Sequence, residues 1–272
     1  MANSIAAQDN VGFFGTEMQI RLQKLAYEAR GRIAETPGLF FSGRMIGIDD
    51  FDALGQAGVQ TLLAEQGMLN TRLMTKDAHE RWTALFEANQ LRVDDALVFM
   101  GETRTVREAI ASILASPLPD GLRLAKDLTH EDAQRFPDLQ RFMVAHGVAP
   151  VYGASLVESN EASTIVIEDE AGMVRAIAHT YFPHNRFNPN HRNAWGGLVA
   201  VDTNLRGLGL GRIVNALMLD RAINRLGATD VYEVASRTNE PSRRMIEGCG
   251  LSLRPDLTAS FIVPLDAGRF TR

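Results

Sequence analysis

Cysteine is nearly absent from this chain, and its basic residues are outnumbered by acidic ones. The 272 residues include one cysteine, Cys249, so an intrachain disulfide and a cysteine-rich metal site are both excluded. Lysine and arginine number 28 against 33 aspartates and glutamates, which gives a net charge of −5. The chain therefore lacks the broad positive field that nucleic acid or an anionic membrane would require, and any phosphate binding must be local.

Long apolar runs are missing as well. No segment approaches the roughly 18 apolar residues of a membrane helix. Residues 1–15 have neither the basic start nor the apolar stretch of a signal peptide. We therefore expect a cytoplasmic protein with no membrane and no nucleic-acid partner. The 45% share of hydrophobic residues, over this length, is enough for one large domain or two modest ones.

The N-terminal part is predicted to be mainly helical. Helix-start signals stand at Thr16, Asp77 and Thr105, and apolar residues follow each of them at three- and four-residue steps. Residues 96–100 form a short apolar run that fits a strand. We find no catalytic signature in this part of the chain.

A change of pattern follows the segment SPLPDG, residues 116–121, whose two prolines interrupt helix and strand alike. We therefore expect a mainly helical N-terminal accessory domain at residues 1–117 and a second domain at residues 118–272. The second domain begins with a short strand, helices and a hairpin over residues 164–181.

Two strand and helix units in succession come next. Residues 194–201 (AWGGLVAV) are typical of a strand and lead to a helix from Leu208, and residues 229–236 (TDVYEVAS) form the next strand. Asn239 then marks the start of the last helix. This order favours parallel neighbouring strands in an α/β sheet.

The loop between the first of these strands and its helix is rich in glycine. Its alternating glycines allow several backbone N–H groups to point at one anion at the positive end of the helix. The alternative is a flexible turn whose glycines permit close packing. No Gly-Lys-Ser/Thr follows, which disfavours nucleotide hydrolysis. A dinucleotide fingerprint starting at Gly207 would place Arg212 where a small residue is needed, with Glu233 as its acid.

Residues 201–212 (VDTNLRGLGLGR) resemble the pyrophosphate-binding motif of the GCN5-related N-acetyltransferase (GNAT) superfamily. That motif is a strand, a short polar loop and then Arg/Gln-x-x-Gly-x-Gly/Ala, and its fixed positions are taken here by Arg206, Gly209 and Gly211. The resemblance continues through the segment NEPSRRMIEGCGL and covers roughly residues 118–272. It leaves the N-terminal part of the chain unexplained.

The resemblance implies an α/β fold with a mixed, splayed central sheet flanked by helices, and acetyl transfer from acetyl-CoA to an amine of a small molecule or peptide. Gly196 and Gly197 fit a bulge that starts the splay, or alternatively a close contact with a helix. The residues implied in acetyl-CoA binding are Val199, Ala200, Val201, Arg206, Gly207, Leu208, Gly209, Leu210, Gly211, Arg212 and Asn239.

The catalytic groups are less well marked. The position where many family members carry a tyrosine that protonates the departing thiolate is Ile246 here, so Tyr181, Tyr232 or a water would replace it. Glu233, a carboxylate in an apolar strand, is our candidate for the base that deprotonates the amine, and pairing with an arginine is its alternative role. His179 is the reserve candidate for the base.

Other features are given plainer interpretations. Two histidines in one loop, His184 and His191, do not make a metal site, and we expect the loop to shape an acceptor pocket instead. No metal is expected, and Cys249 is interpreted as a small buried residue. Two other functions stay open: a non-catalytic acyl-CoA-binding or sensing protein, which the missing tyrosine favours, and a dinucleotide-dependent oxidoreductase, which Arg212 counts against. Neither a particular acceptor nor an oligomeric state is predicted.

Overall fold

One mixed sheet of ten strands runs through the computed structural model, which describes residues 11–267. The strands follow one another across the sheet in the order β1-β2-β3-β10-β4-β9-β8-β7-β6-β5. They are β1 (Leu39–Phe41), β2 (Ile46–Ile48), β3 (Leu69–Thr75), β4 (Leu91–Glu102), β5 (Leu122–Leu124), β6 (Ala162–Asp169), β7 (Val174–Tyr181), β8 (Asn193–Val201), β9 (Asp230–Ser236) and β10 (Ser252–Pro264).

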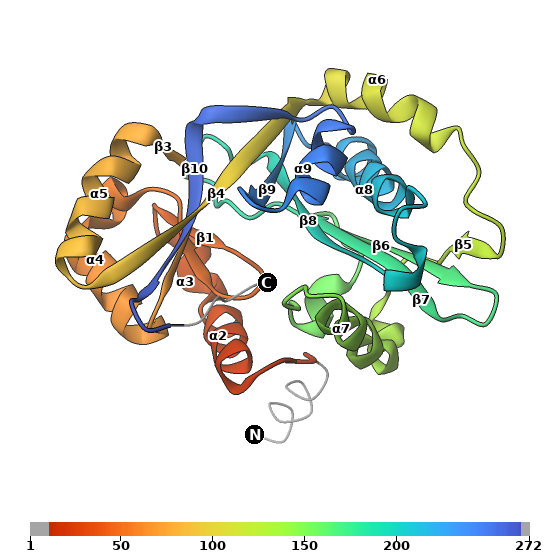
Figure 1. The fold of residues 1–272 in the computed structure, drawn as a ribbon. Helices are drawn as coiled ribbons and strands as arrows, with labels where there is room; N and C mark the ends of the chain where they lie inside the picture. The colour runs from red at the N-terminus through yellow and green to blue at the C-terminus, as the bar shows by residue number, and fades with distance from the viewer. Residues whose placement is uncertain (1–10, 268–272) are drawn as a thin grey trace.

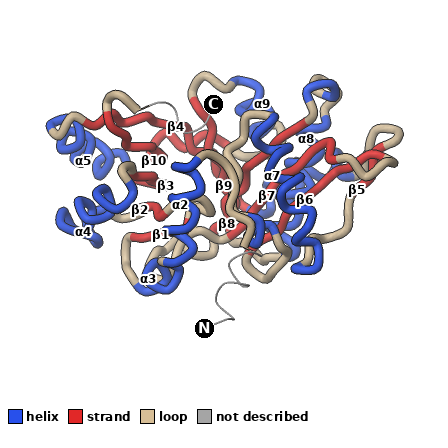
Figure 2. Tube along the Cα trace, turned by 90° about the horizontal axis from the view of Figure 1, so that it is seen from below, coloured by secondary structure: helices blue, strands red, loops and turns tan. Residues whose placement is uncertain are grey.

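Helices cover both faces of this sheet, which confirms the expected mixed α/β fold. In Figure 1, α8 lies above strands β6 to β8 and α7 lies beneath them. Figure 2 shows α4 and α5 gathered at the other end of the sheet. The α-helices are α2 (Glu17–Glu28), α3 (Arg30–Glu35), α4 (Phe51–Gln66), α5 (Lys76–Ala88), α6 (Thr103–Leu114), α7 (Phe136–Ala145), α8 (Leu210–Asp220) and α9 (Glu240–Glu247).

The helix starts agree with the sequence signals to within a few residues. The capping box at Thr16 is confirmed, since its hydroxyl accepts from the Gln19 N–H at 3.3 Å and the Gln19 side chain accepts from the Thr16 N–H at 3.0 Å. The helix expected from Asp77 is capped instead by Thr75, whose hydroxyl accepts from the Ala78 N–H. Each cap satisfies backbone N–H groups that have no partner within the helix.

The N-terminal part contains more strand than the helical signals indicated. The short strand expected at residues 96–100 is the middle of β4, which extends from Leu91 to Glu102. Residues 91–95 (LRVDD) are too polar to suggest a buried strand. They are nevertheless part of β4, because β10 pairs with β4 along this stretch, from Pro264 opposite Leu91 to Ser260 opposite Asp95.

The sheet is built from two similar units that exchange their last strands. The first runs β2-α4-β3-α5-β4 and the second β8-α8-β9-α9-β10. In each unit the first two strands are parallel neighbours, β2 with β3 and β8 with β9. The last strand of each unit then pairs antiparallel with the other unit, β4 with β9 and β10 with β3, while β4 and β10 pair with each other. This repeat is not among the features predicted from the sequence.

The second half of the sheet buries a core on each of its faces. Beneath α8, the first core includes Val214 and Met218 from that helix and Ala178 from β7. On the opposite face, the second core includes Met143 from α7 and Tyr181 from β7. Burying each aliphatic or aromatic side chain contributes about 1.5–3 kcal/mol, so both faces contribute to stability. The faces are called below the α8 face and the α7 face.

The domain division near residue 117 stays a prediction, and the strand exchange bears on its meaning. Limited proteolysis should cut the chain within residues 116–121, which follow α6 and are largely exposed. Because β4 lies between β9 and β10, we expect the two fragments to stay together in native buffer and to separate in denaturant. Size-exclusion chromatography of the cut protein measures this. Fragments that part without denaturant would instead indicate two independent domains, and a chain cut elsewhere would contradict the boundary.

Candidate functional site

The parallel pair β8 and β9 separates partway along its length. Residue pairing begins at Asn193 with Asp230 and ends at Gly196 with Glu233, although β8 continues to Val201 and β9 to Ser236. Beyond that point the facing backbone groups of the two strands are not paired with each other. From there on the two strands form no common hydrogen-bond ladder, so the facing edge of each has backbone groups that an added extended chain could pair with.

A bulge lies where the strands separate. The pairing of β8 with β7 shifts between Ile177 and His179, and Leu198 opposite this shift has a φ of 53°. A Cβ at Gly196 would lie 2.4 Å from the Met218 side chain, and one at Gly197 would lie 2.5 Å from the Trp195 ring. Gly196 and Gly197 therefore fit both interpretations. They precede the bulge, and each lies so close to a neighbouring side chain that a Cβ would force that side chain to shift.

The glycine-rich loop connects the end of β8 to α8. Gly207 and Gly209 have φ angles of 82° and 78°, in the left-handed region that glycine favours, and a Cβ at either would meet nothing within 4 Å. The first intrahelical bond joins the Ile213 N–H to the Gly209 carbonyl at 3.1 Å. The N–H groups of the residues just before Ile213 therefore have no partner within the helix. They lie beside the exposed loop, at the positive end of the helix dipole.

The residues implied in acetyl-CoA binding lie at this end of the sheet, but not all face the loop. Residues 206–209 are exposed and Leu210 is buried in the core on the α8 face. Arg212 is turned away, since its Nη2 donates to the Gly248 carbonyl at 3.0 Å. The Asn239 side chain caps α9 by accepting from the Ser242 N–H at 3.2 Å. Residues 199–201 line the β8 edge beyond the bulge.

Glu233 lies where β8 and β9 separate, on the α8 face. Its Oε1 accepts a hydrogen bond of 2.8 Å from the Asn215 side chain, and it is 2% exposed. Burial raises its pKa to about 7. The structure pairs it with an amide, not with the arginine considered as its alternative partner.

His179 lies on the opposite face and is also 2% exposed. Its Nδ1 is 2.9 Å from the Thr164 hydroxyl, which itself donates to the Leu156 carbonyl at 2.7 Å. Because that hydroxyl proton is already used, Nδ1 is the nitrogen that donates in this contact, and the Ser163 backbone is a further hydrogen-bond partner of the ring. Burial lowers the pKa of His179 to about 4, so the neutral imidazole prevails near neutral pH.

A pocket of about 230 Å³ opens beside His179 on the α7 face. Its walls come from β1 and the following turn, from the segment between residues 152 and 162, and from the end of β7. The lining residues are Phe41, Gly43, His130, Tyr152, Ala154, Ser155, Val157, Glu158, Ser159, Glu161, Ala162, His179, Tyr181 and Phe182. Glu233, on the other face, does not line it.

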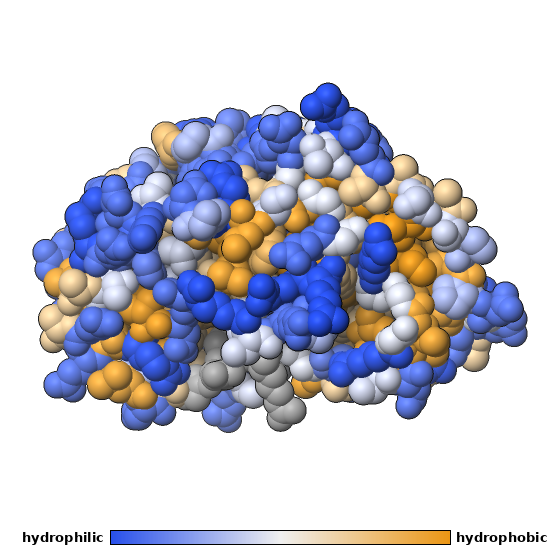
Figure 3. Space-filling model, turned by 45° about the horizontal axis from the view of Figure 1, so that its top comes forward, coloured by the Kyte–Doolittle hydropathy of each residue, from blue (hydrophilic) through white to orange (hydrophobic). Residues whose placement is uncertain are grey.

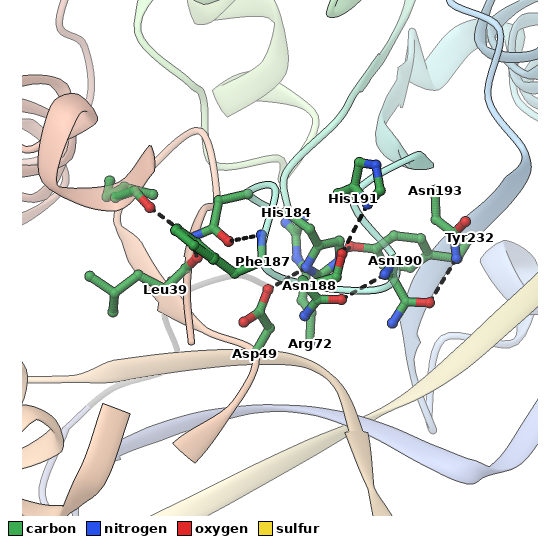
Figure 4. Close-up of polar contacts among 12 residues, drawn as sticks. Leu39, Asp49, Arg72, His184, Phe187, Asn188, Asn190, His191, Asn193 and Tyr232 are labelled. Carbon is green, nitrogen blue, oxygen red and sulfur yellow. Dashed lines mark hydrogen bonds and ion pairs between the residues drawn. The ribbon is translucent and has the colours of Figure 1, made fainter. Parts of the chain in front are cut away.

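The loop with two histidines does not line this pocket, and its expected part in an acceptor pocket stays a prediction. His184 is buried between the two halves of the chain, where Nδ1 is 2.6 Å from the Asp49 carboxylate and Nε2 is 2.9 Å from the Tyr232 hydroxyl (Figure 4). Both ring nitrogens are thus occupied by protein groups, and His191 is exposed. Sequence reasoning missed Asp49 because its partner is 135 positions away in the chain.

Arg72 extends the same buried cluster toward the pocket. Its Nη1 donates to the Tyr181 hydroxyl at 3.1 Å, and its guanidinium lies 4.3 Å from the centre of the Trp195 ring.

Ile246, at the usual tyrosine position, is buried in the core on the α8 face. Within residues 11–267, no group of three His, Cys, Asp or Glu side chains is placed to hold a metal. Nor does any helix in that range have the length and apolarity needed to cross a bilayer. The first ten residues, on which the signal-peptide expectation partly rests, lie outside the described chain.

Comparisons with known proteins point to one family. Residues 125–251 match the family model described as acetyltransferase (GNAT) family. No curated protein matches the sequence.

Solved structures share the fold at low sequence identity. A GCN5-related N-acetyltransferase from Kribbella flavida is 15% identical with a TM-score of 0.52, and the match covers 79% of each chain. A Drosophila protein is 14% identical with a TM-score of 0.53, covering 82% of this chain and 71% of its own. A tandem GNAT protein from the clavulanic acid pathway is 12% identical with a TM-score of 0.50, covering 80% of this chain and 70% of its own.

The raised pKa of Glu233 predicts how its replacement affects stability. The folded state keeps this proton up to about pH 7, whereas an unfolded glutamate releases it near pH 4.3. Stability is therefore lost as pH rises through this window. The glutamine in Glu233→Gln does not titrate. Raising the pH from about 5 to about 8 should therefore increase the stability of this variant relative to the parent by on the order of 1–3 kcal/mol. Urea denaturation at both pH values measures this, with the exposed Glu170→Gln as control. A difference that does not change with pH would contradict the shift.

Proposed function

We propose that the C-terminal part of this chain, a member of the GNAT superfamily, transfers an acetyl group from acetyl-CoA to an amine by direct attack in a ternary complex. The observation that carries the proposal is that β8 and β9 stop pairing beside an open glycine loop. The diverging strand edges would receive the pantetheine arm along residues 199–201. The N–H groups before Ile213 would hold the pyrophosphate.

The chemistry needs a neutral amine close to the thioester. The amine nitrogen forms a bond to the thioester carbon, the carbon–sulfur bond breaks, and the thiolate of CoA then takes up a proton. A backbone N–H of β8 beyond the bulge would stabilise the oxyanion that forms on the carbonyl. The chain must supply a base for the proton that the ammonium form of the acceptor carries.

His179 and Glu233 are the two candidates for that base, and they lie on opposite faces of the sheet. His179 lines the pocket, and with Nδ1 donating to Thr164 its Nε2 would carry the lone pair. Glu233 has the better matched pKa but is covered by α8. Since a base must first be within reach of its proton, we assign the role to His179 and keep Glu233 as the competing candidate.

Tyr181 is better placed than Tyr232 to protonate the thiolate. Tyr181 lines the pocket and its hydroxyl accepts from Arg72, which leaves its own proton to donate. Tyr232 lies behind it with its hydroxyl 2.9 Å from His184.

The buried Ile246 favours one second candidate, an acyl-CoA-binding protein without turnover. The Arg212 side chain, which donates to the Gly248 carbonyl, adds no support for the third function, a dinucleotide-dependent oxidoreductase. With one buried cysteine, the proposed compartment is the cytoplasm.

A substitution at Gly211 tests the pyrophosphate site. A Cβ there would lie 3.6 Å from the Met245 sulfur and 3.7 Å from the Val201 side chain, both ordinary contacts. Gly211→Asp adds a negative charge beside the proposed phosphates, so acetyl-CoA affinity should fall by roughly tenfold or more. Gly211→Ala is the matched control and should retain affinity. Calorimetric titration decides, and unchanged affinity in a folded Gly211→Asp protein would reject the site.

Two conservative variants separate the candidate bases. If His179 is the base, His179→Gln should lower kcat by roughly 10²-fold or more while acetyl-CoA affinity is kept. Glu233→Gln should then leave kcat within a few-fold of the parent. The acidic limb of the pH profile of kcat/KM should lie near pH 4 for His179 and near pH 7 for Glu233. Loss of activity in Glu233→Gln alone would restore Glu233 as the base.

A further inference from the structure

We propose that the acceptor is a small primary amine whose body is apolar or aromatic and carries no anionic group. This inference rests on the proposed acetyl transfer and narrows its substrate class. It is drawn from the pocket beside His179, which is open on the α7 face and lies next to the point where β8 leaves β9. Figure 3 brings the top of Figure 1 toward the viewer, the side of α6 and α8, so it does not look onto the α7 face.

Aromatic rings form much of the pocket wall. The rings of Phe41 and Tyr152 meet edge to face at 6.0 Å between centroids, and those of Phe41 and Tyr181 do so at 6.3 Å. The His179 ring stacks on Tyr181 at 5.4 Å. Such walls favour an apolar or aromatic body, and ring faces also attract an ammonium group.

The charged side chains that line the pocket are acidic. None of the described lining residues is a lysine or arginine, and two are glutamates. Glu158 is already paired, since Arg225 lies 2.9 Å from its Oε1 and the Ser163 hydroxyl donates to its Oε2. Glu161 is exposed and lies next to the lining residue Ala162. Its carboxylate can attract a cation to the pocket.

Two arginines lie behind the wall and are used within the protein. Arg72 donates to the Tyr181 hydroxyl, and the Arg44 Nη1 donates to the Ala149 carbonyl at 3.3 Å. Neither lines the pocket. A carboxylate or phosphate on the acceptor would therefore enter the pocket without a cation to pair with, at the cost of its lost hydration.

The register of the strands orients the amine. His179 pairs with Gly197, directly after the last paired residues of β8 and β9. Neighbouring strands lie about 4.8 Å apart, so the His179 end of the pocket is the end closest to the proposed thioester. The amine nitrogen is therefore placed at His179 and the apolar body toward Tyr152.

Matched amines test the substrate class. 2-Phenylethylamine, phenylalanine and glucosamine share a primary amine and differ in the rest of the molecule. With acetyl-CoA as donor, kcat/KM for phenylethylamine should exceed that for phenylalanine by roughly a hundredfold and that for glucosamine by roughly tenfold or more. Phenylalanine or glucosamine as the better acceptor would overturn the inference while leaving acetyl transfer in place.

Two pairs of variants assign the effect to the pocket. Ala162→Phe places a ring in the pocket and should raise KM for phenylethylamine by roughly tenfold, whereas Ala145→Phe, on the exposed side of α7, should not. Glu161→Lys reverses the charge at the pocket edge and should raise the same KM several-fold. Glu170→Lys makes the same change at the far end of β6 and should not. Equal effects of a variant and its control would overturn the assignment.

A binding measurement keeps the two proposals distinguishable. Thermal stabilisation by phenylethylamine, with no acetyl-CoA present, should be lost in Ala162→Phe and kept in Ala145→Phe. Such a pattern without acetyl-CoA binding would reject the transferase and retain the amine site. Acetyl-CoA binding, measured by calorimetry, without any amine response would reject the amine site alone.

Discussion

The exchange of β4 and β10 at the centre of the sheet is the constraint on which the rest of the structure depends. Each strand leaves the unit that produced it and pairs with the other unit, and the two pair with each other between β3 and β9. Neither unit can complete its hydrogen bonding without the other, because an unpaired strand edge leaves backbone N–H and C=O groups unsatisfied. The exchange therefore fixes the N-terminal half against the candidate acetyltransferase domain.

This attachment gives the N-terminal half a place at the proposed site. Phe41 and Gly43 bring one wall to a pocket whose other walls come from residues after 118. The Asp49 carboxylate, at the end of β2, holds His184 against Tyr232 (Figure 4). Arg72 from β3 donates to the Tyr181 hydroxyl. These polar groups are buried, so each would be costly without its partner. The N-terminal half thus forms part of the proposed acceptor pocket.

The sequence was most informative where function depends on local backbone geometry. The glycine loop, the strand before it and the helix after it could be identified, because alternating glycines and a helix start are neighbours in the chain. The polar half of β4 could not, since Asp94 and Asp95 are held in the sheet by pairing with Phe261 and Ser260. The same limit hid Asp49 and Arg72, whose partners are distant in sequence. Glu233 was expected in an apolar strand and is buried there. The face of the sheet that it occupies depends on register, which no local pattern reveals.

Burial acts in opposite directions on the two candidate bases. It lowers the pKa of His179 to about 4, so near neutral pH almost all of that imidazole is in the form that accepts a proton. It raises the pKa of Glu233 to about 7, so much of that carboxyl is already protonated and cannot act as a base. The stronger base is thus the less available one. If His179 is the base, it needs the pocket beside it to pass its proton to solvent quickly, because so low a pKa means that the proton is held weakly. Glu233, held by Asn215 beneath α8, does not line that pocket, and its raised pKa is explained by burial alone.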